Sequence, residues 1–233
     1  MISVKDLQKN YKHFCLNISA LEFKDGAVYA LVGANGAGKT TLLSCLTNQI
    51  SYMGGIYYDG KLLKENREEI LSYTGFVGER LNFYGDALVR QYFSFMKSFY
   101  PDWDNDTFAD LKSKLAVDVY EKVKLKNLSR GNALKVGLIA CLSCRHKYII
   151  LDEPTSGLDV AMRQEFYGII NTHISHEATV IFSTHMVEDI DSMASHLVLL
   201  NNGVIVLNDK IDSLVQNNGN ENLRNIIIQN ITV

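Results

Sequence analysis

An eight-residue segment, GANGAGKT at positions 33–40, constrains the fold of this chain more than any other feature. It matches the pattern G-x-x-x-x-G-K-[ST], whose glycines let backbone N–H groups turn toward phosphate oxygens. An apolar run at 27–32 precedes the segment, and apolar residues follow it at helical spacing from Leu42 to Ile50. The sequence therefore predicts a buried strand, a phosphate-binding loop and a helix whose N-terminal end adds a partial positive charge.

This loop supplies the first set of candidate site residues. Lys39 is expected to reach the β- and γ-phosphates of a nucleotide, and the Thr40 hydroxyl is expected to ligate Mg²⁺. A chance match is the alternative, because glycine-rich turns are common, but the flanking strand and helix favour phosphate binding. The nucleotide-binding candidates in the loop are Gly33, Asn35, Gly36, Ala37, Gly38, Lys39, Thr40 and Thr41.

A second candidate element, KYIILDE at 147–153, is an apolar strand that ends in two carboxylates. Asp152 stands at the strand end, where it is expected to hold the magnesium through water. Glu153 points in a different direction and is the candidate for polarising an attacking water molecule. An ordinary strand followed by an acidic turn is the alternative interpretation when this element is taken alone.

Strand and helix patterns alternate over much of the chain, which predicts an α/β fold with a largely parallel sheet. Residues 2–32 are strand-like, and Gly54-Gly55 introduces the hairpin-like IYYDGK. A helix pattern at 162–170 and a strand at 179–182 follow the acid pair. A histidine, His185, comes just after that last strand, and ligands collect at the carboxyl edge of parallel sheets, although an isolated histidine is more often a surface or core residue.

Two other regions depart from this alternation. Residues 86–142 are helical in pattern, and Tyr100-Pro101-Asp102 interrupts them because proline cannot continue a helix interior. Near the end, strands at 197–200 and 204–207 flank Asn-Asn-Gly, a strong hairpin signal. The residues after 216 are polar and then apolar, and we expect local disorder around NNGNEN.

Composition limits the function classes that remain. With 47% apolar residues the chain can bury a core, while its apolar runs fall far short of the roughly 20 residues that cross a bilayer. The first residues lack a secretory signal, so we expect a cytoplasmic protein that reaches a membrane only through a partner. A formal net charge of −3 without basic clusters predicts no nucleic-acid partner. The pair Cys141 and Cys144 has no second ligand pair, so two cysteines on a helix face are favoured over a metal or redox site.

Three further motifs give the chain a specific resemblance. Leu-Ser-Arg-Gly-Asn at 128–132 lies between the two phosphate elements, and Ser-Gly-Leu-Asp at 156–159 and His185 follow them. In order and approximate spacing, these motifs resemble the ABC ATPase family over nearly the whole chain. The resemblance implies that Tyr11 stacks on adenine, that Asp159 helps to organise a dimer interface and that His185 contacts the γ-phosphate.

The chain departs from the family pattern at three positions. Where the family signature is usually L-S-G-G-Q, Arg130 and Asn132 replace a glycine and the glutamine, while Ser129 and Gly131 remain to meet a γ-phosphate. Arginine pairs readily with phosphate, so Arg130 either assists or obstructs the site. Glu79 stands where the family has a glutamine near the metal, and we expect it to reach the magnesium or its water.

The resemblance also implies an architecture and an assembly. We expect the ABC ATPase form of the P-loop NTPase fold, with a RecA-like core, an antiparallel β subdomain and a helical signature subdomain at about 80–142. A single ABC ATPase domain is expected over 1–215, followed by a C-terminal tail at 216–233. Because the signature lies far from its own phosphate loop in the family's geometry, two ATPase subunits must pair head to tail around ATP. Homodimer and heterodimer both remain open.

The sequence is consistent with two functions. The first is the ATP-hydrolysing motor subunit of an ABC transporter with separate transmembrane permease subunits. Glu79 and the segment Tyr-Pro-Asp-Trp-Asp at 100–104 make the chain similar to bacterial ABC-2-type exporter ATPases for peptides and drugs. The second is a soluble ABC protein that acts as a regulatory switch or on ribosomes or nucleic acid. Aromatic residues crowd 83–103, and they either pack internally or line the groove that receives the permease in this family.

Overall fold

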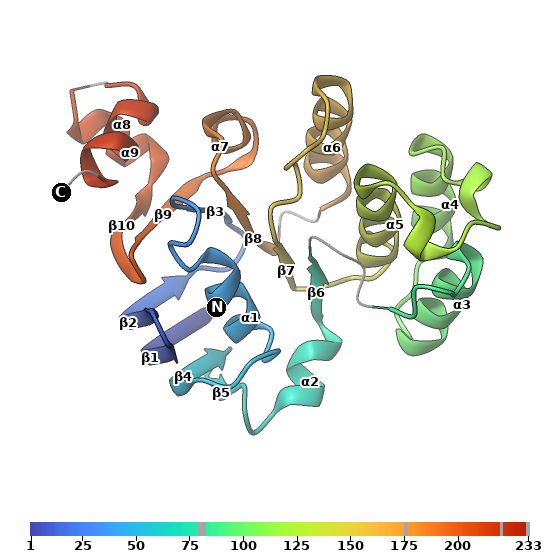
Figure 1. The fold of residues 1–233 in the computed structure, drawn as a ribbon, viewed down its shortest axis with the longest axis horizontal. Helices are drawn as coiled ribbons and strands as arrows, with labels where there is room; N and C mark the ends of the chain where they lie inside the picture. Colours follow the sequence, from blue (N-terminus) through green and yellow to red (C-terminus); the bar gives the residue numbers. More distant parts are fainter. Residues whose placement is uncertain (79–82, 175–176, 220, 232–233) are drawn as a thin grey trace.

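A computed structural model of the chain describes residues 1–78, 83–174, 177–219 and 221–231, the last without its side chain. Within these residues six strands form one sheet, in the order β10-β9-β3-β8-β7-β6 (Figure 1). Neighbouring strands are parallel except β10, which runs antiparallel to β9. The strands are β3 (Val28–Val32), β6 (Thr74–Val77), β7 (Tyr148–Leu151), β8 (Thr179–Thr184), β9 (His196–Asn201) and β10 (Val204–Lys210). The predicted α/β class with a largely parallel sheet is confirmed.

Capping side chains determine where several of the helices begin. Asp104, for example, starts a helix by accepting hydrogen bonds from the backbone N–H groups of Asp106 and Thr107. The helices are α1 (Lys39–Leu46), α2 (Arg67–Ser72), α3 (Val89–Phe99), α4 (Asn105–Lys114), α5 (Arg130–Leu142), α6 (Val160–His173), α7 (Val187–Met193), α8 (Ile211–Asn217) and α9 (Leu223–Ile231). Two short 3₁₀ turns, Asp118–Tyr120 and Leu125–Asn127, connect α4 to α5.

A second, antiparallel sheet covers one face of the main sheet. Its strands, in the order β2-β1-β4-β5, are β1 (Ile2–Tyr11), β2 (Phe14–Phe23), β4 (Met53–Tyr58) and β5 (Lys61–Leu62). Along β2, Leu16 and Ile18 are buried while Cys15 and Asn17 are exposed, as expected for a strand with one covered face. Helix α1 lies between the two sheets (Figure 1), and its buried Leu42 belongs to the core that joins them.

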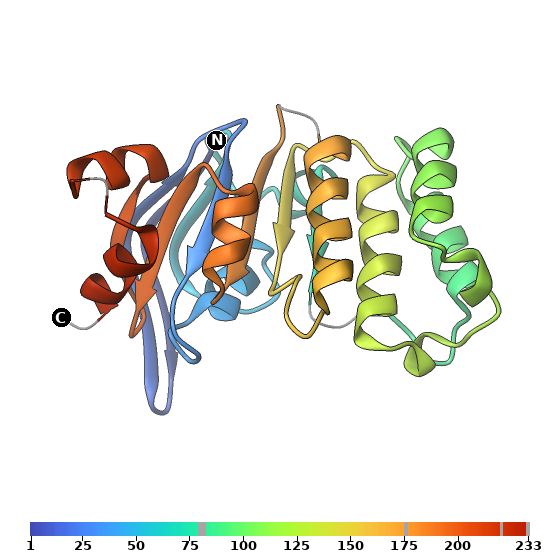
Figure 2. The same cartoon turned by 90° about the horizontal axis from the view of Figure 1, so that it is seen from above.

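Side chains on the two faces of the main sheet belong to two separate hydrophobic cores, because successive side chains along each strand point to opposite faces. On β3, Tyr29 and Leu31 face α1 and the antiparallel sheet, while Ala30 and Val32 face the core lined by helices α5, α6 and α7. Figure 2 shows α5 and α6 side by side, with α3 and α4 stacked beyond α5 at the end of the molecule. The carboxyl ends of β3, β7 and β8 therefore open on one edge, between these layers.

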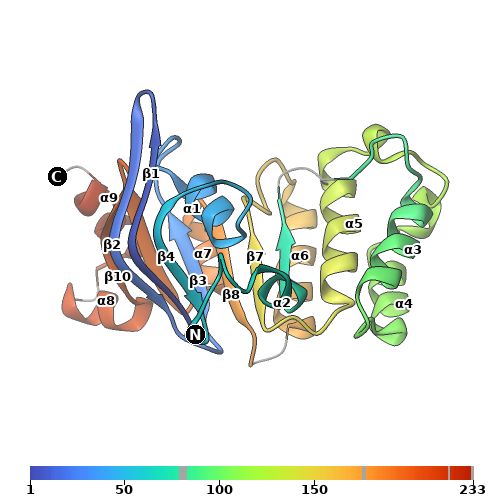
Figure 3. The same cartoon turned by 90° about the horizontal axis from the view of Figure 1, so that it is seen from below.

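The C-terminal segment is more ordered than its sequence predicts. Within 217–222, where the sequence predicts local disorder, Asn217 ends α8, the Asn218 backbone N–H donates to the Leu214 carbonyl of α8, and the Glu221 backbone N–H donates to the Asn218 carbonyl. The apolar residues that follow, Leu223 and Ile227, are buried in the same core as β9. Figure 3 shows α8 and α9 at the end of the molecule opposite α3 and α4. No helix within the described ranges is long and apolar enough to cross a membrane.

Candidate nucleotide site

The glycine-rich loop connects β3 directly to α1, and tight packing leaves no room for side chains at two of its glycines. Gly38 has a φ of 109°, and a Cβ there would lie 2.7 Å from the Phe14 ring. A Cβ on Gly33 would lie 2.4 Å from the carbonyl oxygen of Leu200. Both distances are shorter than carbon contacts allow, so the fold requires glycine at both positions.

Lys39 lies at the centre of this loop and is almost fully buried, with 5% of its surface exposed. Its ammonium donates hydrogen bonds to the carbonyls of Gly33 at 2.9 Å and Ala34 at 3.3 Å. The same nitrogen lies 3.5 Å from Oε1 of Glu153. The lysine thus connects the loop to the acid pair at the end of β7.

The two carboxylates that follow β7 have different environments. Asp152 is buried, and its Oδ1 accepts hydrogen bonds from the Thr40 hydroxyl at 3.3 Å and the Ser183 hydroxyl at 2.6 Å. Glu153 has a φ of 45°, an uncommon conformation for a residue with a side chain. Its backbone N–H donates to the Ser183 hydroxyl at 2.7 Å, which helps to hold that conformation. Ser183 therefore connects β8 to both acids.

His185 completes the group at the sheet edge. Its Nδ1 lies 3.7 Å from Oε2 of Glu153, and about half of its side chain is exposed. It follows β8 directly, and β8 pairs in parallel with both β3 and β7. The structure thus brings together Lys39, Thr40, Asp152, Glu153 and His185, which come from three strand ends.

A cavity of about 480 Å³ opens above this group. Tyr11, which is half exposed at the end of β1, and Glu153, which follows β7, both line it. The residues that line the cavity are Tyr11, Phe14, Asn35, Gly36, Gly38, Lys39, Thr40, Thr41 and Glu153. Gly33 and Ala37 belong to the same loop but do not line the cavity.

A larger cavity of about 760 Å³ lies at the opposite, amino-terminal ends of β7 and β8. It is lined by residues such as Leu142, Arg145 and Ile174, and it contains none of the predicted site residues. Two of its polar side chains already have partners, since Lys147 contacts Asp59 and His173 contacts Asp110. The volume of a cavity therefore does not identify the functional site. The smaller cavity at the phosphate loop is the candidate site, because several polar side chains converge there.

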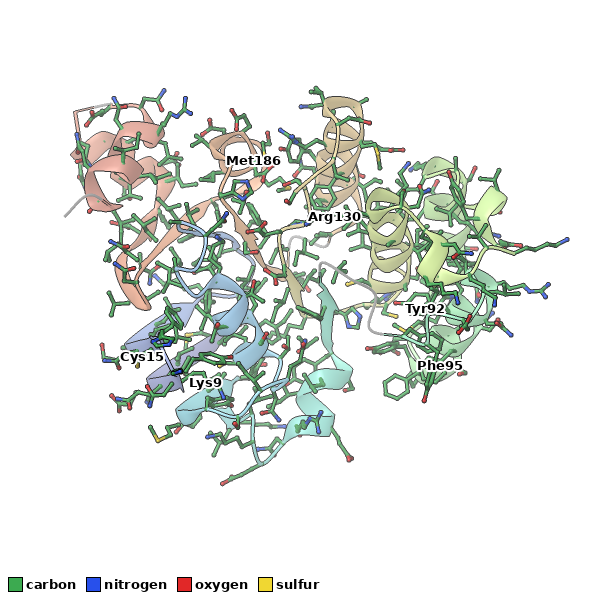
Figure 4. All side chains as sticks on the ribbon, viewed as in Figure 1. Lys9, Cys15, Tyr92, Phe95, Arg130 and Met186 are labelled. Atoms are coloured by element: carbon green, nitrogen blue, oxygen red, sulfur yellow. The ribbon has the colours of Figure 1, made fainter. Side chains whose placement is uncertain are left out.

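The residues of the segment 128–132 lie at the N-terminal end of α5, outside the phosphate-loop cavity. Ser129 caps the helix by accepting a hydrogen bond from the Asn132 backbone N–H at 3.3 Å. A Cβ on Gly131 would lie 2.5 Å from the Met162 methyl carbon of α6. Arg130, labelled in Figure 4, lines a small crevice with Asp152, Glu153 and Ser156. Of this segment, only Arg130 shares a crevice with the acid pair.

Three remaining predictions have separate outcomes. Asp159 caps α6 within the subunit, where its carboxylate accepts a hydrogen bond from the Met162 backbone N–H at 2.8 Å. Glu79 lies outside the described residues, so its metal role stays a prediction.

Cys141 and Cys144 are free and buried, and burial raises the pKa of each thiol to about 12, which keeps both protonated. Across the described ranges, no group of three or more His, Cys, Asp or Glu side chains is arranged to hold a metal ion.

Sequence reasoning missed two residues of this site, Ser183 and Phe14. Ser183 is a buried polar residue that follows the apolar run Val180–Phe182 in β8, and a polar residue at the end of a buried strand was a usable signal. Phe14 lines the cavity beside Tyr11, with ring centroids 6.4 Å apart. Its role depends on the approach of β2 to the loop, which no local pattern reveals.

Comparison with known proteins decides the family. A family model described as ABC transporter matches residues 16–156, which is more than half of the chain. The chain belongs to the ABC transporter family. This ABC ATPase is 30% identical over 189 residues to the putative ABC transporter ATP-binding protein AlbC of Bacillus subtilis, covering 78% of this chain and 79% of that protein. It is 29% identical over 228 residues to the lantibiotic transport ATP-binding protein SrtF of Streptococcus pyogenes, covering 97% and 95%.

Solved structures support the fold of this ABC ATPase. An ATP-binding subunit of an ABC transporter superposes with a TM-score of 0.87 at 20% identity, over 99% of both chains. A dimeric ATP-binding cassette bound to ADP and Pi superposes with a TM-score of 0.76 at 19% identity, over 91% of this chain and 99% of that one. The predicted family, its likeness to exporter ATPases, the ABC ATPase fold and the capacity to bind and hydrolyse ATP are confirmed.

Proposed function

We propose that this ABC ATPase is the motor subunit of an exporter, pairing with a second ATPase subunit on ATP and driving separate transmembrane permease subunits. The observation that carries the proposal is the convergence of Lys39, Thr40, Asp152 and Glu153 at one sheet edge. These groups provide both a phosphate-binding loop and an acidic residue beside it, which is what hydrolysis of a bound triphosphate requires.

In this proposal the loop binds the phosphates of ATP, and Tyr11 stacks on the adenine. Lys39 turns its ammonium from the loop carbonyls to the β- and γ-phosphates, and Thr41 and the loop N–H groups bind the neighbouring oxygens. Glu153 accepts hydrogen bonds from the attacking water and orients it toward the γ-phosphate. His185 lies close enough to Glu153 to contact the same phosphate group.

The donor set near Asp152 fits Mg²⁺. The Thr40 hydroxyl oxygen and Asp152 Oδ1 are 3.3 Å apart, so one Mg²⁺ could be held by Thr40 directly and by Asp152 through a water molecule. Mg²⁺ keeps several waters and binds substrate phosphates, so it does not need a cluster of protein carboxylates. When bound, the ion neutralises charge on the phosphates. Thr40 and Asp152 are the residues that would hold it, with Glu79 as the proposed third.

A second subunit completes the site in this proposal. Ser129, Gly131 and Asn132 stand at the start of α5 and do not line their own subunit's phosphate cavity. A two-fold pair would present them to the γ-phosphate held by the partner, with Asp159 near the shared interface. Arg130 brings an additional cation to that interface. Because this cation is absent from the usual signature, pairing with a related but different ATPase is as consistent with the sequence as a homodimer.

An exposed aromatic surface is the proposed docking site for the permease. Tyr84, Phe95 and Phe99 are exposed, and the rings of Phe95 and Phe99 stack with centroids 6.1 Å apart. Tyr92 is buried by contrast, and Figure 4 labels it beside Phe95 on α3. Of the two alternatives for the aromatic residues, internal packing therefore does not hold for Tyr84, Phe95 and Phe99. Exposed aromatic residues are effective interface anchors.

The cargo is proposed to be a peptide or a drug-like molecule, by analogy with the lantibiotic transport protein among the relatives. Docking to a permease would hold the ATPase on the cytoplasmic face of the membrane. This placement is part of the same proposal.

The hydrolysis role is tested with Glu153→Gln in the purified full chain. The variant should lose turnover and accumulate an ATP-bound dimer, because the site still binds ATP but no longer activates water. Size-exclusion chromatography with ATP and a phosphate-release assay measure both effects. The matched control is Glu188→Gln, the same substitution at an exposed position of α7. Steady hydrolysis by Glu153→Gln would move the water-activating role to another residue.

Partner identity needs a separate experiment. Affinity purification of the tagged chain in mild detergent, followed by mass spectrometry, should recover a protein with several membrane spans and either one or two kinds of ATPase subunit. Recovery of ribosomal proteins or nucleic acid in place of a membrane protein would support the alternative soluble function.

A further inference from the structure

A buried carboxylate lies behind the catalytic edge, on the first turn of α7. Asp189 is 0% exposed. Its Oδ2 accepts hydrogen bonds from the Thr155 hydroxyl at 2.6 Å and from the Thr184 hydroxyl, and its Oδ1 accepts one from the Tyr167 hydroxyl. The three donors come from three different segments, so this one side chain joins parts of the chain that are distant in sequence.

The buried Asp189 side chain depends on these three hydroxyl donors, because a buried carboxylate is strongly unfavourable unless its oxygens are hydrogen-bonded. Asp189 forms no ion pair with any residue that the structure describes, and hydroxyl groups satisfy it instead. Burial, and then the neighbouring Asp189 carboxylate, raise the pKa of the Tyr167 hydroxyl, which therefore remains a donor. Both oxygens of the Asp189 side chain have hydrogen-bond partners inside the protein. The cluster is therefore a firm connection rather than an incidental contact.

The donors flank the two groups proposed to act on the γ-phosphate. Thr155 is two residues after Glu153, and Thr184 is the residue immediately before His185. Thr184 Oγ1 also accepts a hydrogen bond from the Met186 backbone N–H at 3.0 Å, so it holds the backbone on both sides of His185. Met186 is labelled in Figure 4 at the start of α7. The cluster thus joins the loop after β7 to the loop after β8.

We infer that Asp189 is a positioning residue for ATP hydrolysis, which sets the spacing between the loops that carry Glu153 and His185. This inference rests on the proposed roles of those two residues. Ser183 joins the same loops on the nucleotide side through Asp152 and the Glu153 backbone. Asp189 joins them on the far side, together with α6 through Tyr167. Two separate connections therefore define how Glu153 and His185 face each other.

The position of the cluster predicts a particular kinetic effect. Asp189, Thr155, Thr184 and Tyr167 do not line the phosphate-loop cavity. Their loss should therefore change the geometry of the water-activating groups while leaving nucleotide binding nearly intact. A small displacement of a catalytic group lowers the rate by about 10- to 100-fold. The effect should thus appear in kcat, with the KM for ATP changed by less than about twofold.

The decisive experiment compares hydroxyl deletions with hydroxyl rescues. Thr184→Val and Thr155→Val remove a donor while keeping the branched shape, and Thr184→Ser and Thr155→Ser restore it. Asp189→Asn keeps the size of the acid but places an NH₂ donor against hydroxyl donors. The matched control is Thr74→Val, because Thr74 is also buried and donates one hydroxyl hydrogen bond, to the Ile70 carbonyl at 2.8 Å, away from the site. Phosphate release, ATP affinity and melting temperature are measured for each purified full chain.

Asp189→Asn and both valine variants should lose about tenfold or more in kcat. The serine variants and Thr74→Val should keep a kcat near that of the wild type. The affinity for ATP should be similar in all of these variants. The inference is overturned if the valine variants resemble Thr74→Val in kcat at similar melting temperatures, or if KM rises in proportion to the loss of kcat. Should Asp189→Asn fail to fold, the threonine series still decides. Failure of the proposed function is distinguishable, because Glu153→Gln would then retain hydrolysis whatever the Asp189 cluster does.

Discussion

Ser183→Ala tests how strongly the strand that precedes His185 is connected to the acid pair. The Ser183 hydroxyl donates to Asp152 at 2.6 Å and accepts from the Glu153 backbone N–H at 2.7 Å. Alanine removes both bonds and leaves a buried carboxylate oxygen and a partly buried N–H without these partners. A hydrogen bond to a charged group contributes about 1.5–3 kcal/mol to stability, and the neutral bond adds about 1 kcal/mol.

These values sum to about 3 kcal/mol of lost stability for Ser183→Ala. For a domain of this size each kcal/mol lowers the melting temperature by about 2–4 °C, so a decrease of about 6–12 °C is expected. The assay is thermal unfolding followed by circular dichroism without nucleotide, with phosphate release measured in parallel. We also expect kcat to fall by about tenfold, because the Glu153 backbone loses its support.

The control is Ser143→Ala, the same substitution at another fully buried serine. The Ser143 hydroxyl donates a single bond to the Ile139 carbonyl at 2.6 Å, with no charged partner. Its loss should destabilise the protein by only about 1 kcal/mol and leave hydrolysis unchanged. If both variants lost equal stability and equal activity, the charge-assisted connection between Ser183 and the acids would contribute nothing beyond an ordinary hydrogen bond.

Three other predictions concern nucleotide binding and pH. Lys39→Ala should weaken ATP binding by about 10- to 100-fold, since it removes a charge-assisted contact with phosphate. Calorimetry measures the affinity for ATP, with Lys61→Ala at an exposed position as the control. Equal affinities of the two variants for ATP would refute the contact between Lys39 and the phosphates. Tyr11→Ala should reduce the preference for ATP over GTP in competition binding, and an unchanged preference would remove the stacking role. Burial lowers the pKa of His146 to about 4. Between pH 6.5 and about 4 the unfolded chain therefore binds a proton at His146 that the folded chain does not bind. The free energy of unfolding should fall by about 3 kcal/mol as the pH is lowered across this range. His146→Phe should flatten this part of the pH profile in urea unfolding, and an equally steep profile would contradict the assignment.

The parts of this site that the sequence predicts are those determined by local chain geometry. A glycine-rich loop between a buried strand and a helix forms the same backbone path wherever it occurs, so 33–40 could be assigned from its letters. The acid pair at 152–153 was also visible, because a buried apolar strand that ends in carboxylates places them at the sheet edge. The hairpin at 201–203 followed from Asn-Asn-Gly in the same way, and the structure confirms its antiparallel pairing.

Other parts depend on which segments meet in space, and local patterns do not determine that. The segment VEDID contains three acids, and only packing against Tyr167, Thr155 and Thr184 selects Asp189 for burial. Helix α9 was missed for a similar reason. Its preceding polar residues resemble a disordered linker, whereas its own apolar residues find a partner surface beside α8 and β10 that the sequence does not reveal.

The contact between Gly131 and Met162 links the bulk of two positions on different helices. Since a methyl group on Gly131 would overlap the end of the Met162 side chain, the sum of the two side-chain volumes is limited rather than either one separately. A library that randomises both positions should therefore recover compensating pairs, such as alanine on α5 with valine on α6. Homologous sequences aligned at these two sites should show the same inverse relation in residue size.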